Sequence, residues 1–108
     1  GKITVNDATV TSTGAEVAVI EGANSITLNN SKLTSSMADK WGVMIYQSFS
    51  GDAEGTEGTF TMNGGSLTDT DKNSPLFYLT NAEGTITLKG VEVSAASGVL
   101  VKAAANKR

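Results

Sequence analysis

One ten-residue pattern occurs four times in this chain, and it constrains the fold more than any other feature. The copies read GKITVNDATV, NSITLNNSKL, GTFTMNGGSL and GTITLKGVEV, and they begin near positions 1, 24, 58 and 84. The four copies align without a gap, although they are unequally spaced along the chain. Repeats at intervals of about 20–50 residues are typical of solenoids, in which each repeat buries its apolar face against the next.

Apolar residues alternate with threonine in every copy. The apolar columns hold Ile3, Ile26, Phe60 and Ile86, then Val5, Leu28, Met62 and Leu88, and the column between them holds Thr4, Thr27, Thr61 and Thr87. This period of two predicts a strand with an apolar face and a threonine face. No segment shows the 3.6-residue period of a helix, which excludes a helical repeat.

A corner and two further strands complete each repeat. The corner position holds Asp7, Asn30, Gly64 and Gly90, which are residue types that tolerate a left-handed backbone. A second short strand follows, with Val10, Leu33, Leu67 and Val93 as its apolar column. The third strand is VAVI, VMIY, LFYL or VLVK, and turn residues precede it.

Like residues recur one whole repeat later, so equivalent strands are expected to stack in parallel, about 4.8 Å apart. The sequence therefore predicts an all-β fold: a right-handed parallel β-helix of about four coils with three short strands each, spanning residues 1–108 as one segment. The right hand follows from the unequal insertions and from the strong right-handed bias of parallel crossovers.

The columns of Ile-Thr-Leu followed by an Asn or Gly corner and a Gly-Val-x-Val strand resemble the right-handed β-helices of the pectate-lyase-like superfamily. Within it, the chain is most similar to the repetitive, Thr- and Ser-rich, adhesin-like surface proteins of bacteria. The resemblance implies the fold but does not choose among lyases, hydrolases, phage tailspikes and non-enzymatic passenger domains.

The third strand predicts an apolar strip on the outside of the coils. In the register that aligns Val17, Val43, Leu76 and Val99 as inward residues, the outward residues are Ala18, Met44, Phe77 and Leu100, followed by Ile20, Tyr46, Leu79 and Lys102. The lysine favours this register, because a buried unpaired lysine is costly. A shifted register stays open, since both faces are apolar.

Two loops are candidate binding sites. The longest insertion, residues 47–58, carries Asp52, Glu54 and Glu57, and long excursions from a rigid scaffold often carry function. A plain flexible bulge is the alternative. The loop SSMADKWG holds Trp41, for which we favour a lid over the coil interior, with a sugar-stacking platform as the alternative.

Few residues are candidates for catalysis or for metal binding. The chain has no His and no Cys, and the carboxylate and histidine motifs of polygalacturonase-like enzymes are absent. Asp69 and Asp71, in the turn TDTDKNS, are weak candidates for a calcium site through oxygen ligands. A solvated turn in which they cap backbone donors is the favoured interpretation. No other cofactor is expected.

The amino-acid composition argues against some classes of partner and favours one location. The net charge of −3 argues against a nucleic-acid partner, and no run of about 18 apolar residues exists to span a membrane. The richness in Ser, Thr, Asn and Gly fits an extracellular or cell-surface location. We expect a non-enzymatic, structural and adhesive segment of a secreted or surface-anchored bacterial protein that contacts glycans or proteins.

Two alternative functions stay open. In the first, the chain is a fragment of a polysaccharide lyase or hydrolase whose catalytic coils lie outside it. The stacked T-x-T triplets raise ice binding as a remote alternative, but the array degrades in the first two copies. Neither end shows the polar cap that terminal repeats normally carry, so we expect an interior segment of a longer solenoid or end-to-end stacking of copies.

Overall fold

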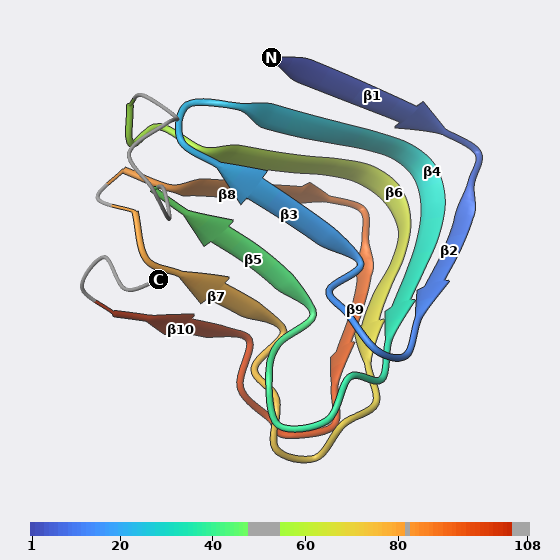
Figure 1. The fold of residues 1–108 in the computed structure, drawn as a ribbon. Coiled ribbons are helices and arrows are strands. Elements are labelled where there is room, and N and C mark those ends of the chain that lie inside the picture. The colour runs from blue at the N-terminus through green and yellow to red at the C-terminus, as the bar shows by residue number, and fades with distance from the viewer. Residues whose placement is uncertain (48–54, 82, 105–108) are drawn as a thin grey trace.

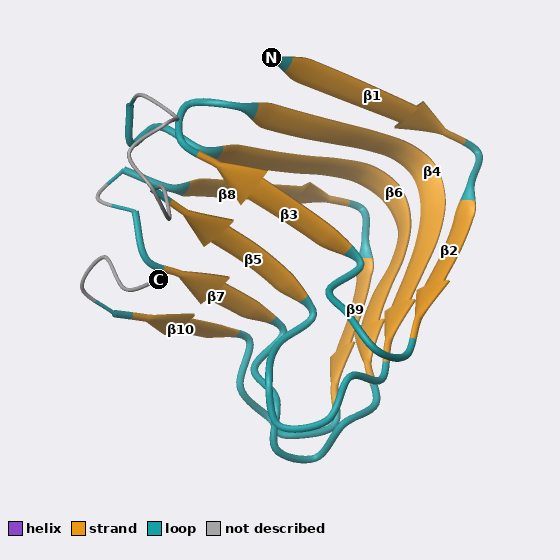
Figure 2. Ribbon diagram, in the orientation of Figure 1, coloured by secondary structure: helices purple, strands orange, loops and turns teal. Residues whose placement is uncertain are grey.

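The computed structural model describes residues 1–47, 55–81 and 83–104, and every regular element in these ranges is a β-strand (Figures 1 and 2). The first repeat forms β1 (Lys2–Asn6), β2 (Thr9–Ser12) and β3 (Ala18–Glu21). The second forms β4 (Ser25–Ser35) and β5 (Val43–Tyr46), and the third forms β6 (Thr59–Asp69) and β7 (Phe77–Leu79). The fourth forms β8 (Thr85–Lys89), β9 (Glu92–Ala95) and β10 (Val101–Ala103).

These strands build two sheets in which every pairing is parallel. The first sheet has the order β1-β4-β6-β8, with β2 paired to β4 and β9 paired to β6. The second sheet has the order β3-β5-β7-β10. Figure 1 shows that each strand lies beside its counterpart from the neighbouring repeat. The all-β prediction and the parallel stacking of equivalent strands are therefore confirmed.

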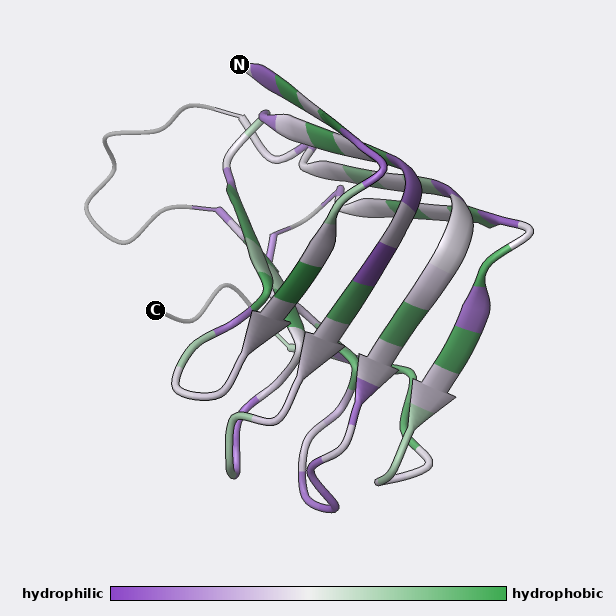
Figure 3. Cartoon of the chain, turned by 90° about the vertical axis from the view of Figure 1, so that its right-hand side faces the viewer, coloured by the Kyte–Doolittle hydropathy of each residue, from purple (hydrophilic) through white to green (hydrophobic). Residues whose placement is uncertain are grey.

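The register of the first sheet matches the predicted columns residue by residue. Ile3 pairs with Ile26, which pairs with Phe60, and the threonines of the next column pair in the same way. Figure 3 shows the result as bands of similar hydropathy that run across neighbouring strands. A ladder of amides adds to the stacking: Asn29 Nδ2 donates to Asn6 Oδ1 and Asn63 Nδ2 donates to Asn29 Oδ1, each at 2.9 Å.

The predicted corners are also present. Asp7, Asn30, Gly64 and Gly90 have φ angles of 55°, 50°, 70° and 63°, all in the left-handed region. In the second and third repeats the strand continues through the corner, so that β4 and β6 each span both sides of it. In the first and fourth repeats the corner separates two shorter strands, β1 from β2 and β8 from β9.

The apolar core lies between the two sheets, and buried residues from both contribute to it. Leu28, Phe60 and Met62 come from the first sheet, and Ile45 and Phe77 come from the second. The rings of Phe60 and Phe77 meet edge to face with their centroids 5.3 Å apart. This contact joins the sheets in the middle of the core, where burial of large side chains contributes most to stability.

The register predicted for the third strand is wrong in three of the four repeats. The structure pairs Ala18 with Val43, Val43 with Phe77, and Phe77 with Val101. Relative to the prediction, the strand is shifted by one residue in the first and third repeats and by two in the fourth. Both faces of this strand are apolar, so the sequence pattern specifies its register only weakly.

The shift moves several predicted surface residues into the core. Ile20 and Phe77 are buried core residues, and Ala18 and Leu79 pack against the core, so all four were wrongly expected to face outward. Val99 lies just before β10 and is exposed, as are Val93 and Val101 of the same repeat. Met44, Tyr46 and Lys102 do face away from the core, because they alternate with inward neighbours. The predicted apolar strip therefore does not form in its predicted composition.

Candidate functional site

The outer face of the second sheet carries an aromatic cluster that the corrected register brings together. The outward column consists of Val19, Met44, Tyr78 and Lys102. The ring of Trp41, which precedes β5, stacks on the ring of Tyr78 with centroids 4.3 Å apart and an interplanar angle of 14°. We call Trp41 and Tyr78, together with the Glu16 carboxylate described next, the aromatic surface.

Polar groups hold the indole of Trp41 in place. Its Nε1–H donates to Glu16 Oε2 at 2.8 Å, and the Nζ of Lys40 lies 5.6 Å from the ring centroid. Trp41 and Tyr78 are both half-buried, and neither belongs to the apolar core. The arrangement favours the platform interpretation of Trp41 over the lid, because the indole packs on an outward-facing side chain.

Met44 and Tyr46 lie on the same outer face but are almost fully buried. Tyr46 pairs with Glu21 of the first repeat and hydrogen-bonds to its carboxylate. Burial raises the pKa of the Tyr46 phenol, and the charge and hydrogen bond of Glu21 raise that pKa further, followed by the charge of Glu16. The phenol therefore stays protonated. These two residues support the surface from beneath and offer little area to a ligand.

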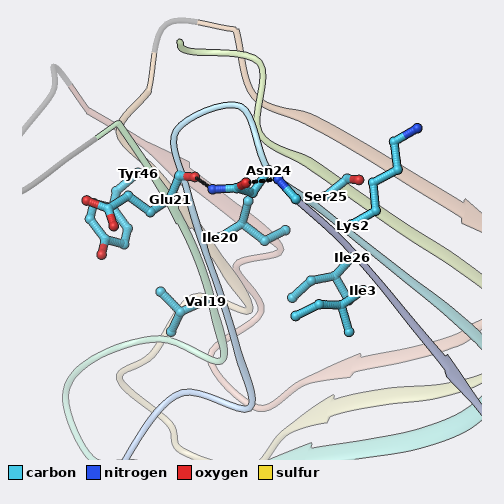
Figure 4. Close-up of a pocket in the computed structure, with 10 residues that line it drawn as sticks. Lys2, Ile3, Val19, Ile20, Glu21, Asn24, Ser25, Ile26 and Tyr46 are labelled. Atoms are coloured by element: carbon cyan, nitrogen blue, oxygen red, sulfur yellow. Dashed lines mark hydrogen bonds between the residues drawn. The ribbon is translucent and has the colours of Figure 1, made fainter. Parts of the chain in front are cut away.

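A pocket of about 410 Å³ lies beside Tyr46, at the edge formed by the first repeat (Figure 4). Its apolar lining comes from Ile3, Val19, Ile20 and Ile26. In Figure 4, Tyr46 and Glu21 lie on one side of the pocket and Ile3 and Ile26 on the other. The amide of Asn24 hydrogen-bonds to the carbonyl oxygen of Glu21 and to the N-terminal amine, which closes the rim.

The aspartates proposed for calcium are used by the protein itself. Asp71 Oδ2 accepts hydrogen bonds from the Ser74 hydroxyl at 2.7 Å and from the backbone N–H groups of Asp39 and Asn73. These bonds, with that of Ser74 the strongest, lower the pKa of Asp71. The geometry agrees with the favoured interpretation, a turn in which Asp71 caps backbone donors. No group of three or more metal-binding side chains exists among residues 1–47, 55–81 and 83–104.

Asp69 is different, because its carboxylate is fully buried at the end of β6. Oδ1 accepts the N–H of Asp71 at 3.0 Å, while Oδ2 has no hydrogen-bond partner. Burial raises the pKa of Asp69, although the Asp71 N–H acts in the opposite direction. Asp69 therefore lies inside the structure, away from any position where an external ligand would meet both aspartates.

The structure describes only part of the 47–58 insertion. Asp52 and Glu54 lie outside the described residues. Glu57 is exposed, and its carboxylate accepts the N–H of Thr56 at 3.1 Å. The Thr56 hydroxyl in turn donates to Glu83 at 2.9 Å, which ties this segment to the fourth repeat.

Tyr78, Glu16 and Glu21 also belong to the outer face, although the sequence pattern did not predict them there. Tyr78 was hidden by the wrong register, which placed Phe77 outside. Glu16 and Glu21 flank the first copy of the third strand, where a charge at each end is an ordinary feature of a strand boundary. Their partners, Trp41 and Tyr46, belong to the next repeat, so only the stacking of repeats reveals the pairs.

Comparison with protein families, with curated proteins and with solved structures finds no match for this chain. Within the described ranges there is also no helix that is long and apolar enough to cross a membrane.

Proposed function

We propose that this chain is a right-handed β-helix segment with a structural and adhesive role, and that its aromatic surface binds glycan chains. The parallel pairing of every strand with its counterpart one repeat away supports the β-helix, and the bias of parallel crossovers supports its hand. A secreted or cell-surface location in a bacterium fits the Ser-, Thr-, Asn- and Gly-rich composition.

The stack of Trp41 on Tyr78 outside the core is the observation that carries this proposal. The core is already filled by Phe60, Phe77 and their neighbours, so the exterior pair is not needed to close it. Aromatic faces pack well against the C–H face of a sugar ring, and adjacent polar groups bind its hydroxyls. Glu16 supplies a carboxylate at the edge of the indole.

The environments of Asp69 and Asp71, at the turn that follows β6, favour a binding role over catalysis. Asp71 is engaged by three donors, and Asp69 is buried. Glycoside hydrolases need two carboxyl groups that flank a bound substrate, which this pair does not offer. Protein neighbours are a second class of partner for the same surface, since exposed aromatic residues also serve protein contacts.

The proposal is tested by screening the purified chain against an array of bacterial and host glycans. Any bound glycan is then titrated against Trp41→Ala, for which we expect at least about a tenfold loss of affinity, or about 1.4 kcal/mol. Tyr78→Phe is the matched control, because it keeps the stacked ring. Unchanged affinity in Trp41→Ala, with the fold intact by circular dichroism, would show that glycans do not bind at the aromatic surface.

One observation favours ice binding as a second candidate. The threonines of the first sheet pair in strict register across four strands, which gives an outward row of hydroxyl and methyl groups. The adjacent outward column is less regular, since it begins with Lys2 and Ser25. Thermal hysteresis that disappears in Thr61→Tyr would support this candidate, and its absence from the parent chain would exclude it.

A further inference from the structure

The two rings of the aromatic surface come from two connections that lie side by side. The connection between β4 and β5, residues 36–42, carries Trp41, and the connection between β6 and β7, residues 70–76, runs beside it (Figure 1). The 70–76 connection leads directly into β7, which has Tyr78 at its centre. Contacts between these two connections therefore bear on how the rings meet.

Two side chains of the 70–76 connection bind the backbone just before Trp41. The N–H of Asp39 donates to Asp71 Oδ2 at 3.1 Å, and the N–H of Lys40 donates to Ser74 Oγ at 3.1 Å. Asp39 and Lys40 immediately precede Trp41 in the chain. Both hydrogen bonds therefore act within two residues of the indole, and both come from the neighbouring repeat.

Asp71 and the fully buried Ser74 act as one unit. The Ser74 hydroxyl lies 2.7 Å from Asp71 Oδ2 and 3.1 Å from the carbonyl oxygen of Met37. The hydrogen bond from Ser74, followed by that from the Asp39 N–H, lowers the pKa of Asp71, so the carboxylate is charged at neutral pH. The single hydroxyl proton goes to this carboxylate, because a charged acceptor at the shorter distance makes the stronger bond. The hydroxyl oxygen is thereby oriented to accept the N–H of Lys40.

The backbone of the 36–42 connection needs this support. Asp39 has a φ angle of 59°, a left-handed conformation that is unfavourable for a residue with a side chain. Asn73 Nδ2 donates to Asp39 Oδ1 at 2.9 Å, so the 70–76 connection binds the side chain of Asp39 as well as its N–H. Without these bonds the backbone at Asp39 would be free to leave the left-handed region, and Trp41, two residues later, would move away from Tyr78.

We propose that Asp71 and Ser74 are positioning residues for the aromatic surface: they hold the 36–42 connection so that the indole of Trp41 lies flat on Tyr78. The observed stack, with ring centroids 4.3 Å apart and an interplanar angle of 14°, is the arrangement that they hold. That a glycan needs this arrangement rests on the proposed function. A loop that is already in place spares the ligand the cost of ordering it, so affinity falls with the fraction of molecules in which the loop has moved.

The first test uses the fluorescence of Trp41, which is the only tryptophan among the 108 residues. In Ser74→Ala and in Asp71→Ala we expect its emission to shift to longer wavelength, and acrylamide to quench it more strongly than in the parent chain. Ser97→Ala is the matched control. The Ser97 hydroxyl donates to the carbonyl of Ser74 at 2.6 Å, so its loss removes a hydrogen bond from the 70–76 connection but none from the 36–42 connection. The emission of this control should equal that of the parent chain.

The second test measures the affinity for a glycan that the array screen identifies. We expect Ser74→Ala and Asp71→Ala each to weaken binding about three- to tenfold, as for the loss of one or two hydrogen bonds. When Trp41→Ala is already present, Ser74→Ala should weaken binding no further, because it acts through Trp41. Circular dichroism confirms the fold of each variant. If Ser74→Ala does not fold, Asp71→Ala takes its place in both tests, since the Asp71 side chain is only half-buried.

The two tests separate the positioning role from the proposed function. Emission that is unchanged in the folded variants, or that changes equally in Ser97→Ala, would overturn the proposal. A loss of affinity that persists in the Trp41→Ala background would overturn the route through Trp41. If no glycan binds the parent chain, the proposed function fails, and the emission of Trp41 still decides whether Asp71 and Ser74 position it.

Discussion

The backbones of two neighbouring repeats approach closely at Gly65, and its replacement by alanine tests how tightly the repeats stack. Gly65 follows the corner glycine of β6 and pairs with Ser31 of β4. A Cβ atom at Gly65 would lie 1.9 Å from the backbone oxygen of Ser31 and 2.8 Å from its backbone nitrogen. The neighbouring atoms are main chain in a paired strand, so they cannot move aside without disturbing the ladder.

Two effects reduce the free energy of unfolding in the Gly65→Ala variant, and they add. The φ angle of 85° places the residue in a conformation that costs a side-chain-bearing residue about 1–2 kcal/mol. The overlap with Ser31 adds about 1–3 kcal/mol, as for other overpacked sites. The expected loss of unfolding free energy is therefore roughly 2–5 kcal/mol. For a domain of this size that is a fall in melting temperature of about 8–20 °C.

The adjacent residue provides the matched control. Gly64 has a φ angle of 70°, but a Cβ there would meet nothing closer than the Cα of Asn30, at 3.9 Å. Gly64→Ala therefore carries only the conformational cost, about 1–2 kcal/mol. Gly64→Asn should cost less still, because Asn30 and Asp7 already occupy this column with left-handed backbones and a side-chain hydrogen bond between them.

Thermal and urea unfolding followed by circular dichroism measure all three variants against the parent chain. The expected order of stability is parent and Gly64→Asn highest, then Gly64→Ala, then Gly65→Ala. If Gly64→Ala and Gly65→Ala were equally stable, the two strands would not approach at Ser31, and the stacking register around the corner would be wrong.

Three further outcomes follow from the burial of particular side chains. Phe77→Ala should cost about 3–5 kcal/mol in urea unfolding and Tyr78→Ala clearly less, because only Phe77 lies in the core; the reverse order would restore the register first predicted from sequence. Asp69→Asn should be more stable than the parent chain at neutral pH. The raised pKa of Asp69 means that the folded state holds its proton more tightly than the unfolded state does, so the parent chain loses stability as pH rises from the usual 3.8 through the folded pKa. The stability advantage of Asp69→Asn should therefore vanish at acidic pH. An advantage that is constant with pH would contradict this. Calcium and a chelator should leave the melting temperature unchanged, whereas Asp71→Ala should lower it, because the Asp71 carboxylate already accepts hydrogen bonds from Asn73 and Ser74 of its own turn and from the Asp39 N–H of the preceding repeat. A calcium-dependent rise would return Asp71 to the metal candidates.

The first sheet could be derived from the sequence because its two faces differ in chemistry. Alternation of apolar residues with threonine leaves one register that buries the apolar set, and any one-residue slip would expose it. The corner residues carry independent information, since Asp, Asn and Gly are the types that adopt the observed positive φ angles. Two signals therefore agreed at every repeat, and the alignment matched the structure from Ile3 to Leu88.

The sequence by itself determined the β-strands of the first sheet, their parallel pairing and the corners, because these depend on local periodicity and on residue types that recur from repeat to repeat. Only the tertiary structure decided the register of the second sheet, in which VMIY and LFYL are apolar on both faces. There the position of each strand follows from contacts across the core, such as that of Phe60 with Phe77, and from the turn that precedes the strand. The aromatic surface depends on that register, since Trp41 meets Tyr78 only when Phe77 faces inward.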